Sequence, residues 1–283
     1  MNIRVLEKSS KNGFMFYISY NGKKFNCFDE MEGKISVKGE FRKIMHSLGF
    51  TWAKGIQQAG RTDAKVSAKE NILYVSSNYS GDIYKLIEEF NKNSGNKLKI
   101  NRVEKTIAGL VFPDMIEGRQ YLYNYPIQKI KRDKQEIEGL CTKLSGKYDV
   151  SEFTDTKGKM LQEHIREVEV KFTDEGLRFR GNSFMPKQVR IMSGYILTGE
   201  KTALPGEYLT LEKIILTPKM KELIITEETE MCKEGVLKIE KIGNGTTYIF
   251  YIPKGKKGEF IGKNGKNIKG LRKKYGEIIV REL

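Results

Sequence analysis

Hydrophobic residues recur with helical spacing in two segments of the N-terminal third of the chain. In both segments they stand three and four positions apart, which places them on one face of a helix. The first stripe, within residues 39–49, is formed by Phe41, Ile44, Met45 and Leu48. The second is formed by Ile83, Leu86, Ile87 and Phe90. We expect both stripes to pack into a core rather than to bind a ligand.

Other segments alternate hydrophobic and polar residues or are rich in β-branched and aromatic residues, which is typical of strands. They are residues 13–20, 71–77, 98–106, 118–125, 166–172 and 177–180. The first ends at Asn21-Gly22, a strong turn signal. Residues 133–146 predict a further helix. Such a mixture predicts an α+β fold, a sheet with helices packed on one face.

The C-terminal part has a pattern of its own. Strands are expected near residues 236–241 and 246–252, then a Lys- and Gly-rich helical stretch, then a last strand at 277–282. Residues 218–234 are rich in Lys and Glu and read as a hinge. We therefore expect a main domain over 1–217, a linker over 218–234 and a small α/β domain over 235–283.

Charge narrows the class of partner. The 283 residues include 51 Lys+Arg and 36 Asp+Glu, a formal net charge of +15. Residues 233–283 alone hold 13 Lys+Arg and 5 Glu. Such a surplus suggests RNA, DNA or an anionic membrane as partner, although a generally lysine-rich composition is the alternative.

Cysteine and histidine usage excludes several kinds of chemistry. Cys27, Cys141 and Cys232 are scattered, which argues against a disulfide framework, and His46 and His164 are too few for an ordinary zinc site. No apolar run approaches the roughly 20 residues that span a bilayer. We expect a soluble, cytoplasmic protein that needs no metal and no cofactor.

Candidate chemistry lies in the stretch Gln-Ala-Gly-Arg-Thr-Asp-Ala-Lys-Val-Ser-Ala, residues 58–68. Gly60 and its neighbours predict a loop just before a strand, and loops on a rigid scaffold often carry function. By spacing alone, Arg61 and Asp63 are equally compatible with a surface turn that contains a local ion pair.

This loop resembles the catalytic loop of the TruA family of tRNA pseudouridine synthases, Gly-Arg-Thr-Asp-Ala-Gly-Val-His-Ala. Seven of the nine positions match, and the departures are Lys65 for Gly and Ser67 for His. The family's nucleophilic aspartate corresponds to Asp63. We expect Arg61 to contact RNA near the target nucleotide. Lys65, where the family has glycine, is expected either to add a contact with an RNA phosphate or to reflect a relaxed loop.

Two later segments resemble the same family. Residues 118–125 match its Arg-x-Tyr-x-Tyr strand, in which the first tyrosine, here Tyr121, stacks on the target base. Residues 181–194 match Gly-x-x-Phe-x-x-x-x-Val-Arg-x-Met-x-Gly, whose arginine, here Arg190, pairs with the catalytic carboxylate and keeps it ionised. Without the resemblance, Tyr121 is equally well part of an aromatic sheet face, and Arg190 a surface arginine. Pro186 suits the first turn of the helix that carries Arg190.

The Lys-rich stretch near the C-terminus resembles the Gly-x-x-Gly loop of a KH domain, which clamps a single-stranded backbone. The resemblance assigns RNA contacts to Gly262, Lys263, Asn264, Gly265 and Lys266. The element order fits the type II KH arrangement.

Together, these resemblances imply a pseudouridine synthase fold, a mixed and mostly antiparallel sheet with flanking helices, followed by a KH-like domain. The expected activity is isomerisation of uridine in tRNA, in the anticodon stem-loop, by a homodimer. Whether Asp63 attacks C1′ or C6, or removes a proton from C2′, stays open. The alternative is a non-catalytic RNA-binding or RNA-chaperone protein, a decayed synthase body with a working KH domain, to which Lys65 and Ser67 point.

Overall fold

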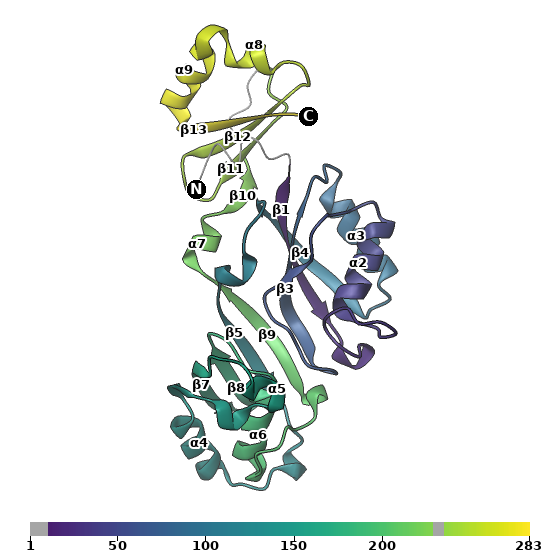
Figure 1. Ribbon diagram of the computed structural model, residues 1–283, viewed down its shortest axis with the longest axis vertical. Coiled ribbons are helices and arrows are strands. Elements are labelled where there is room, and N and C mark those ends of the chain that lie inside the picture. The colour runs from purple at the N-terminus through teal and green to yellow at the C-terminus, as the bar shows by residue number, and fades with distance from the viewer. Residues whose placement is uncertain (1–10, 229–234) are drawn as a thin grey trace.

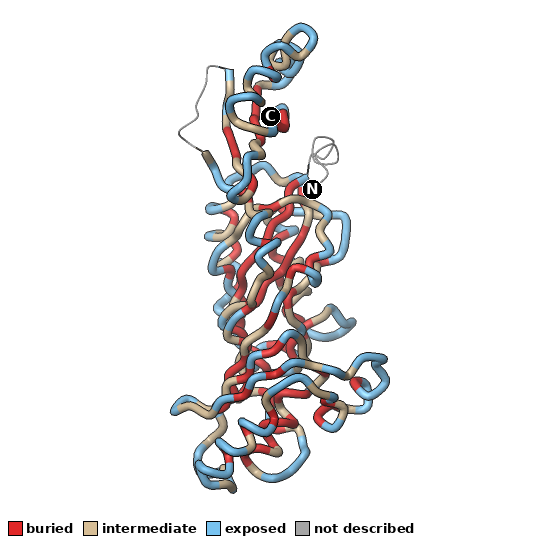
Figure 2. The backbone as a smooth tube through the Cα atoms, turned by 90° about the vertical axis from the view of Figure 1, so that its left-hand side faces the viewer, coloured by how far each residue is buried: buried red, intermediate tan, exposed pale blue. Residues whose placement is uncertain are grey.

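A computed structural model describes residues 11–228 and 235–283 as an elongated molecule built on one sheet (Figure 1). The sheet has 13 strands within these residues. Its order is β13-β12-β11-β10-β4-β1-β3-β9-β5-β8-β7-β6, with β2 paired to β3. Buried residues follow the strands along the whole length of the molecule (Figure 2).

The strands, in chain order, are β1 Asn12–Tyr20, β2 Gln57–Gln58, β3 Ser67–Ser77, β4 Leu98–Ile107, β5 Ile116–Tyr123, β6 Gly146–Asp149, β7 Ile165–Thr173, β8 Gly176–Gly181, β9 Leu209–Leu216, β10 Ile224–Glu227, β11 Lys238–Ile242, β12 Thr247–Ile252 and β13 Glu277–Glu282. The helices are α2 Val37–Ser47, α3 Ile83–Asn93, α4 Lys134–Lys143, α5 Thr156–Lys159, α6 Gln188–Thr198, α7 Pro218–Lys221, α8 Lys257–Ile261 and α9 Lys266–Tyr275. Two pairs of strands, β3–β9 and β12–β13, are parallel, and the other pairs are antiparallel. The predicted α+β class with a mixed, mostly antiparallel sheet is confirmed.

In the first half, β1 lies between β3 and β4, and α2 and α3 pack beside them (Figure 1). The predicted helical stripes are confirmed as core, because Phe41 and Phe90 are fully buried and their rings meet at 5.6 Å. The Ser36 side chain accepts from the Gly39 N–H and caps the start of α2, a contribution of about 1 kcal/mol.

In the second half, α4 packs against β7 and α6, and α6 packs against β5. Val189, Met192 and Ile196 of α6 are buried, as the spacing predicted. The prediction for Pro186 is wrong, because α6 begins only at Gln188. Lys187 adopts a left-handed backbone with φ of 58°, which cannot continue a right-handed helix back to Pro186.

The segment that we expected to be a linker holds secondary structure in its described part. Residues 218–221 form α7, and β10 pairs with β4 on one side and β11 on the other. The helix α7 and the strand β10 are stabilised by the burial of Met220 and Ile225. The remaining residues of the expected linker, 229–234, lie outside the described residues, as does Cys232.

The C-terminal unit, residues 235–283, has the element order expected from the sequence. Its helices α8 and α9 cover one face of its strands, with a core of its own formed by Ile239, Phe250, Ile252, Ile268, Ile278 and Val280. Among the described residues, no helix is both long and apolar enough to cross a membrane.

Candidate active site

Asp63 lies in the loop between β2 and β3, at the place where the sequence predicted a loop. The Val66 N–H donates to the Asp63 carbonyl at 3.2 Å and closes a turn. Within that turn Lys65 has φ of 65°, a left-handed conformation that favours glycine. The backbone therefore keeps a glycine-type shape although the residue is lysine.

The turn packs against the end of β1 at very short range. A Cβ atom on Gly22 would lie 2.2 Å from the Val66 carbonyl oxygen, so only glycine fits there. The Gly22 N–H also donates to Ser67 Oγ at 3.0 Å. Ser67, one of the two departures from the family pattern, thus holds the end of the loop to the Asn21-Gly22 turn.

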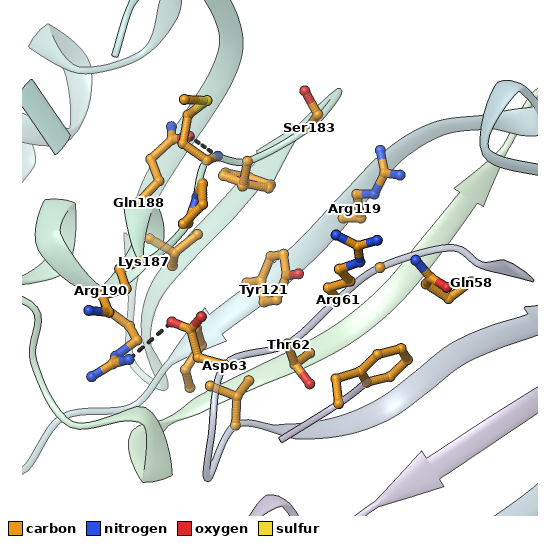
Figure 3. A pocket seen from close by; sticks show the side chains of 18 of the residues that line it. Gln58, Arg61, Thr62, Asp63, Arg119, Tyr121, Ser183, Lys187, Gln188 and Arg190 are labelled. Atoms are coloured by element: carbon orange, nitrogen blue, oxygen red, sulfur yellow. Dashed lines mark hydrogen bonds and ion pairs between the residues drawn. The ribbon is translucent and has the colours of Figure 1, made fainter. Parts of the chain in front are cut away.

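Arg190 and Asp63, 127 positions apart in sequence, form an ion pair across the site (Figure 3). Arg190 Nη1 donates to Asp63 Oδ2 at 3.0 Å, and Arg190 Nε donates to the Leu204 carbonyl at 2.6 Å. The second bond fixes the guanidinium in one orientation. The side chain of Asp63 stays 32% exposed, so its second oxygen is accessible to a ligand.

Tyr121 lies beside Asp63 in the same cavity (Figure 3). Its ring meets Phe184 edge to face, with centroids 5.3 Å apart. Burial raises the pKa of the Tyr121 phenol well above its ordinary value, so it stays protonated at neutral pH. The cavity measures about 680 Å³, which is enough for a nucleoside. Tyr123 lies on the same strand, whereas Tyr125 lies beyond the end of β5.

Two residues, one on β5 and one on β3, hold the loop that carries Asp63, and sequence reasoning missed both. Arg119 on β5 donates through Nε and Nη2 to the Ala59 carbonyl, at 2.9 and 2.7 Å. Asn71 on β3 is fully buried and donates to the Gly60 carbonyl at 2.8 Å. The two carbonyls directly before Arg61 are thus both bound. The only feature of the sequence that pointed to Arg119 was its place in the Arg-x-Tyr pattern, and no feature of the sequence pointed to Asn71.

A second buried hydrogen bond supports the same loop. The hydroxyls of Tyr20 and Thr62 lie 2.8 Å apart, and both residues are buried. Burial raises the pKa of Tyr20 to about 12, so the hydroxyl remains neutral. Thr62, between Arg61 and Asp63, is therefore held from the β1 side.

Cationic side chains surround the mouth of the cavity. Arg61 lines it and pairs with Asp29 at 3.1 Å, while 72% of its side chain remains exposed. Lys157 and Lys187 line it from the other side. Lys65 is exposed on the same loop, but it does not line the cavity.

The predicted RNA-binding residues 262–266 lie in the C-terminal unit, away from this cavity (Figure 1). They connect α8 to α9, and Gly262, Asn264 and Gly265 all have positive φ. Lys263 and Lys266 are exposed, and neither forms an ion pair with any described residue. The structure thus brings Asp63, Tyr121, Arg190 and Arg61 together and leaves the second set at another place.

The cavity therefore offers one accessible carboxylate, held by a guanidinium, beside an aromatic ring. Such an arrangement can bind a flat ring by stacking. The carboxylate can attack an electrophilic carbon of that ligand or accept a proton from it. Cations at the rim favour a ligand that carries phosphates.

Curated proteins similar to this chain are tRNA pseudouridine synthases. The tRNA pseudouridine synthase A of Streptococcus pyogenes serotype M49 (strain NZ131) and that of serotype M1 are each 26% identical to it over 232 residues, covering 73% of this chain and 90% of the relative. A chain in the crystal structure of a Cbf5-Nop10-Gar1 complex is 11% identical with a TM-score of 0.34, covering 76% of this chain and 51% of that chain. A pseudouridylate synthase structure is 12% identical with a TM-score of 0.35, covering 74% and 66%. No protein-family model matches the chain.

Proposed function

We propose that this chain is an RNA pseudouridine synthase that isomerises uridine in tRNA, at the anticodon stem-loop, with Asp63 as the nucleophile. The observation that carries the proposal is the ion pair of Asp63 and Arg190 beside the Tyr121 ring, in a cavity of nucleoside size. The similarity to tRNA pseudouridine synthase A supports the reaction and the class of substrate.

In the proposed reaction the target uridine leaves its helix and enters the cavity, where its base stacks on Tyr121. The bond from C1′ to N1 breaks, the base turns, and a bond from C1′ to C5 forms. C5 loses its proton and N1 gains one. Asp63 attacks C1′ or C6, or takes the proton from C2′, and Arg190 orients the carboxylate in each case. These steps require no redox change.

The remaining predicted residues bind the RNA around this uridine. Arg61 replaces its contact with Asp29 by one with a phosphate near the target, and Lys65 adds a second contact from the exposed side of the loop. The KH-like loop, with Lys263 and Lys266, holds a single-stranded segment elsewhere on the same RNA. The proposed active form is a homodimer, as in the resembled family.

The test is tritium release from tRNA that carries [5-³H]uridine, for the wild type and for Asp63→Asn. We expect release by the wild type and none by the variant, because an amide can neither attack nor accept the proton. Asp29→Asn is the matched control, since it removes another carboxylate that pairs with an arginine at the same cavity and should retain release.

A different outcome supports the alternative function. Lys65 and Ser67, at the positions where the family has Gly and His, favour a protein that binds RNA without reacting. In that case no tRNA or rRNA transcript would release tritium, while tight RNA binding would persist and would be lost in Gly265→Asp.

A further inference from the structure

The C-terminal unit is joined to the main body by a continuous sheet. Domains connected by a plain linker usually move relative to each other. Here β10 pairs with β4 at Thr106 and Lys105 and with β11 at Ile242. The Thr106 hydroxyl also donates to the Leu223 carbonyl at 2.6 Å. Within residues 11–228 and 235–283, strand pairing runs without a break from β4 through β10 to β11.

A buried ion pair crosses the same junction. Lys105 of β4 donates to both carboxylate oxygens of Glu240 on β11, at 2.7 and 2.9 Å. The Glu240 side chain is only 3% exposed, and the Tyr251 hydroxyl donates to it at 2.8 Å. Farther along, Arg281 of β13 donates to the Asn12 side chain of β1 at 2.8 Å.

Apolar packing adds to these polar contacts. Ile225, Ile242, Ile249, Tyr251 and Ile279 form a buried cluster at the junction, against which Ile107 of β4 packs. A Cβ atom on Gly243 would lie 2.1 Å from the Glu222 carbonyl oxygen, so the turn after β11 fits closely against the segment before β10. Contacts of this kind resist local opening.

The two proposed RNA-contact sites therefore lie at a fixed separation along one molecule (Figure 1). The KH-like loop belongs to the unit of β11 to β13, and the cavity lies between β5, the start of β9 and the loop before β3. From β12, the strand order places β3 five strands away and β5 seven. Neighbouring strands lie about 4.8 Å apart, and the 11 residues of β3 add about 3.3 Å each, because the cavity lies before its Ser67 end while β10 joins the sheet near its Ser77 end. The two sites are therefore separated both across and along the strands, by a distance on the order of 50 Å.

We propose that the protein selects an RNA in which an unpaired segment lies on the order of 50 Å from the target uridine, because the rigid junction presents both sites at that spacing. The inference rests on the proposed function for its reaction. It adds a substrate class, namely structured RNAs large enough to carry both features. An isolated stem-loop would occupy the catalytic cavity only.

The experiment uses synthetic RNAs with the target uridine in the loop of a hairpin and an unpaired tail at the other end of a stem of graded length. We expect kcat/KM to peak at one stem length, at about 100-fold above the same hairpin without a tail, since a second contact on one ligand raises affinity by such factors. Equal kcat/KM across the series would overturn the proposal, as would a shallow dependence without an optimum.

Gly265→Asp tests whether the second contact is the KH-like loop. The residue precedes α9 with φ of 73°, a left-handed conformation that aspartate tolerates better than most residues, and a Cβ atom there would meet its nearest neighbour at 3.6 Å, an ordinary contact. Circular dichroism of the variant checks that it is folded. Its charge repels phosphate, and we expect the peak to fall to the tailless level while the tailless hairpin is unaffected. Gly270→Asp, which adds the same charge at an exposed position of α9 outside this loop, is the control and should keep the peak. If Gly265→Asp leaves the peak unchanged, the C-terminal loop is not the second site.

Binding separates this inference from the proposed reaction. The affinity of Asp63→Asn for the same series should show the same optimum. If no RNA is converted and the optimum in affinity remains, the reaction is wrong and the spacing is right. If uridine is converted but no stem length gives an optimum, the reaction is right and the spacing is wrong.

Discussion

At the scale of single residues, the loop that carries Asp63 is held in a conformation that its sequence only partly favours. Lys65 occupies a left-handed backbone position, which costs a residue with a Cβ about 1–2 kcal/mol. The close approach of Gly22 to Val66 leaves the turn no other shape. Because this conformation of Lys65 lowers the stability of the fold, a contact with RNA better explains a lysine beside the proposed nucleophile.

Lys65→Gly should therefore stabilise the fold and weaken RNA binding. Glycine removes about 1–2 kcal/mol of backbone strain from the folded state. Its greater conformational freedom in the unfolded chain costs about 0.5–1 kcal/mol of that gain. The free energy of unfolding should therefore rise by about 0.5–1 kcal/mol. Losing one phosphate contact should reduce the slope of log K against log salt by about 1. Urea unfolding and salt-dependent filter binding measure the two effects.

Lys65→Asn is the control for this change, because asparagine tolerates the left-handed backbone but carries no charge. It should show the weaker binding with less stabilisation. An unchanged salt slope in both variants would mean that Lys65 contacts no phosphate.

At the scale of elements, side chains of β3 and β5 fix the loop that carries Asp63 by donating hydrogen bonds to two consecutive backbone carbonyls. The planar guanidinium of Arg119 reaches the Ala59 carbonyl with two N–H groups, which a lysine cannot reproduce. Burial lowers the pKa of Arg119. Burying this cation costs free energy unless its N–H groups are hydrogen-bonded. The Arg119 guanidinium is therefore held where it can donate to the Ala59 carbonyl.

Arg119→Lys should lower kcat by about 100-fold with little change in KM, because a loop displaced by about 1 Å misplaces the nucleophile while RNA contacts elsewhere remain. Single-turnover tritium release with the wild type and the variant measures it. Arg180→Lys is the control, since Arg180 is an exposed residue one strand away on β8. A rise in KM alone would instead make Arg119 a binding residue.

At the scale of the whole molecule, one buried carboxylate connects the main body to the C-terminal unit. Burial opposes the charge on Glu240, but attraction to Lys105 and the hydrogen bonds from Lys105 and Tyr251 outweigh it, so the pKa of Glu240 lies below its ordinary value of 4.5. A depressed folded-state pKa adds stability above the unfolded pKa, and that stability is lost as the pH falls through the folded value.

Glu240→Gln should therefore lower the free energy of unfolding by about 3 kcal/mol near neutral pH, since it leaves Lys105 without its partner. The difference from the wild type should shrink as the pH falls below about 4.5. Urea unfolding at several pH values measures it. Glu227→Gln is the control, because Glu227 pairs with Lys238 while 58% of its side chain is exposed, and it should change stability little. A difference independent of pH would mean that the charge of Glu240 is not the cause.

Local patterns in the sequence determined many of the helices and strands, and the resemblance to a family indicated the candidate nucleophile. The stripes of α2 and α3, the strands β3, β4, β7 and β8, and the loop that carries Asp63 follow from neighbouring residues alone, because helical and strand periodicities are local properties. The family resemblance named Asp63, Tyr121 and Arg190 as a set before their contacts were known, and their roles in catalysis remain predictions.

Tertiary structure decided what depends on residues far apart in the chain. Arg119 and Asn71 act on the loop through backbone carbonyls, which leave no mark in the side-chain pattern. Residues 218–227 looked like a charged hinge, yet they form α7 and β10, because burying Met220 and Ile225 outweighs the local preference for a loop. The ion pair of Lys105 and Glu240 joins residues 135 positions apart, and only folding brings them together.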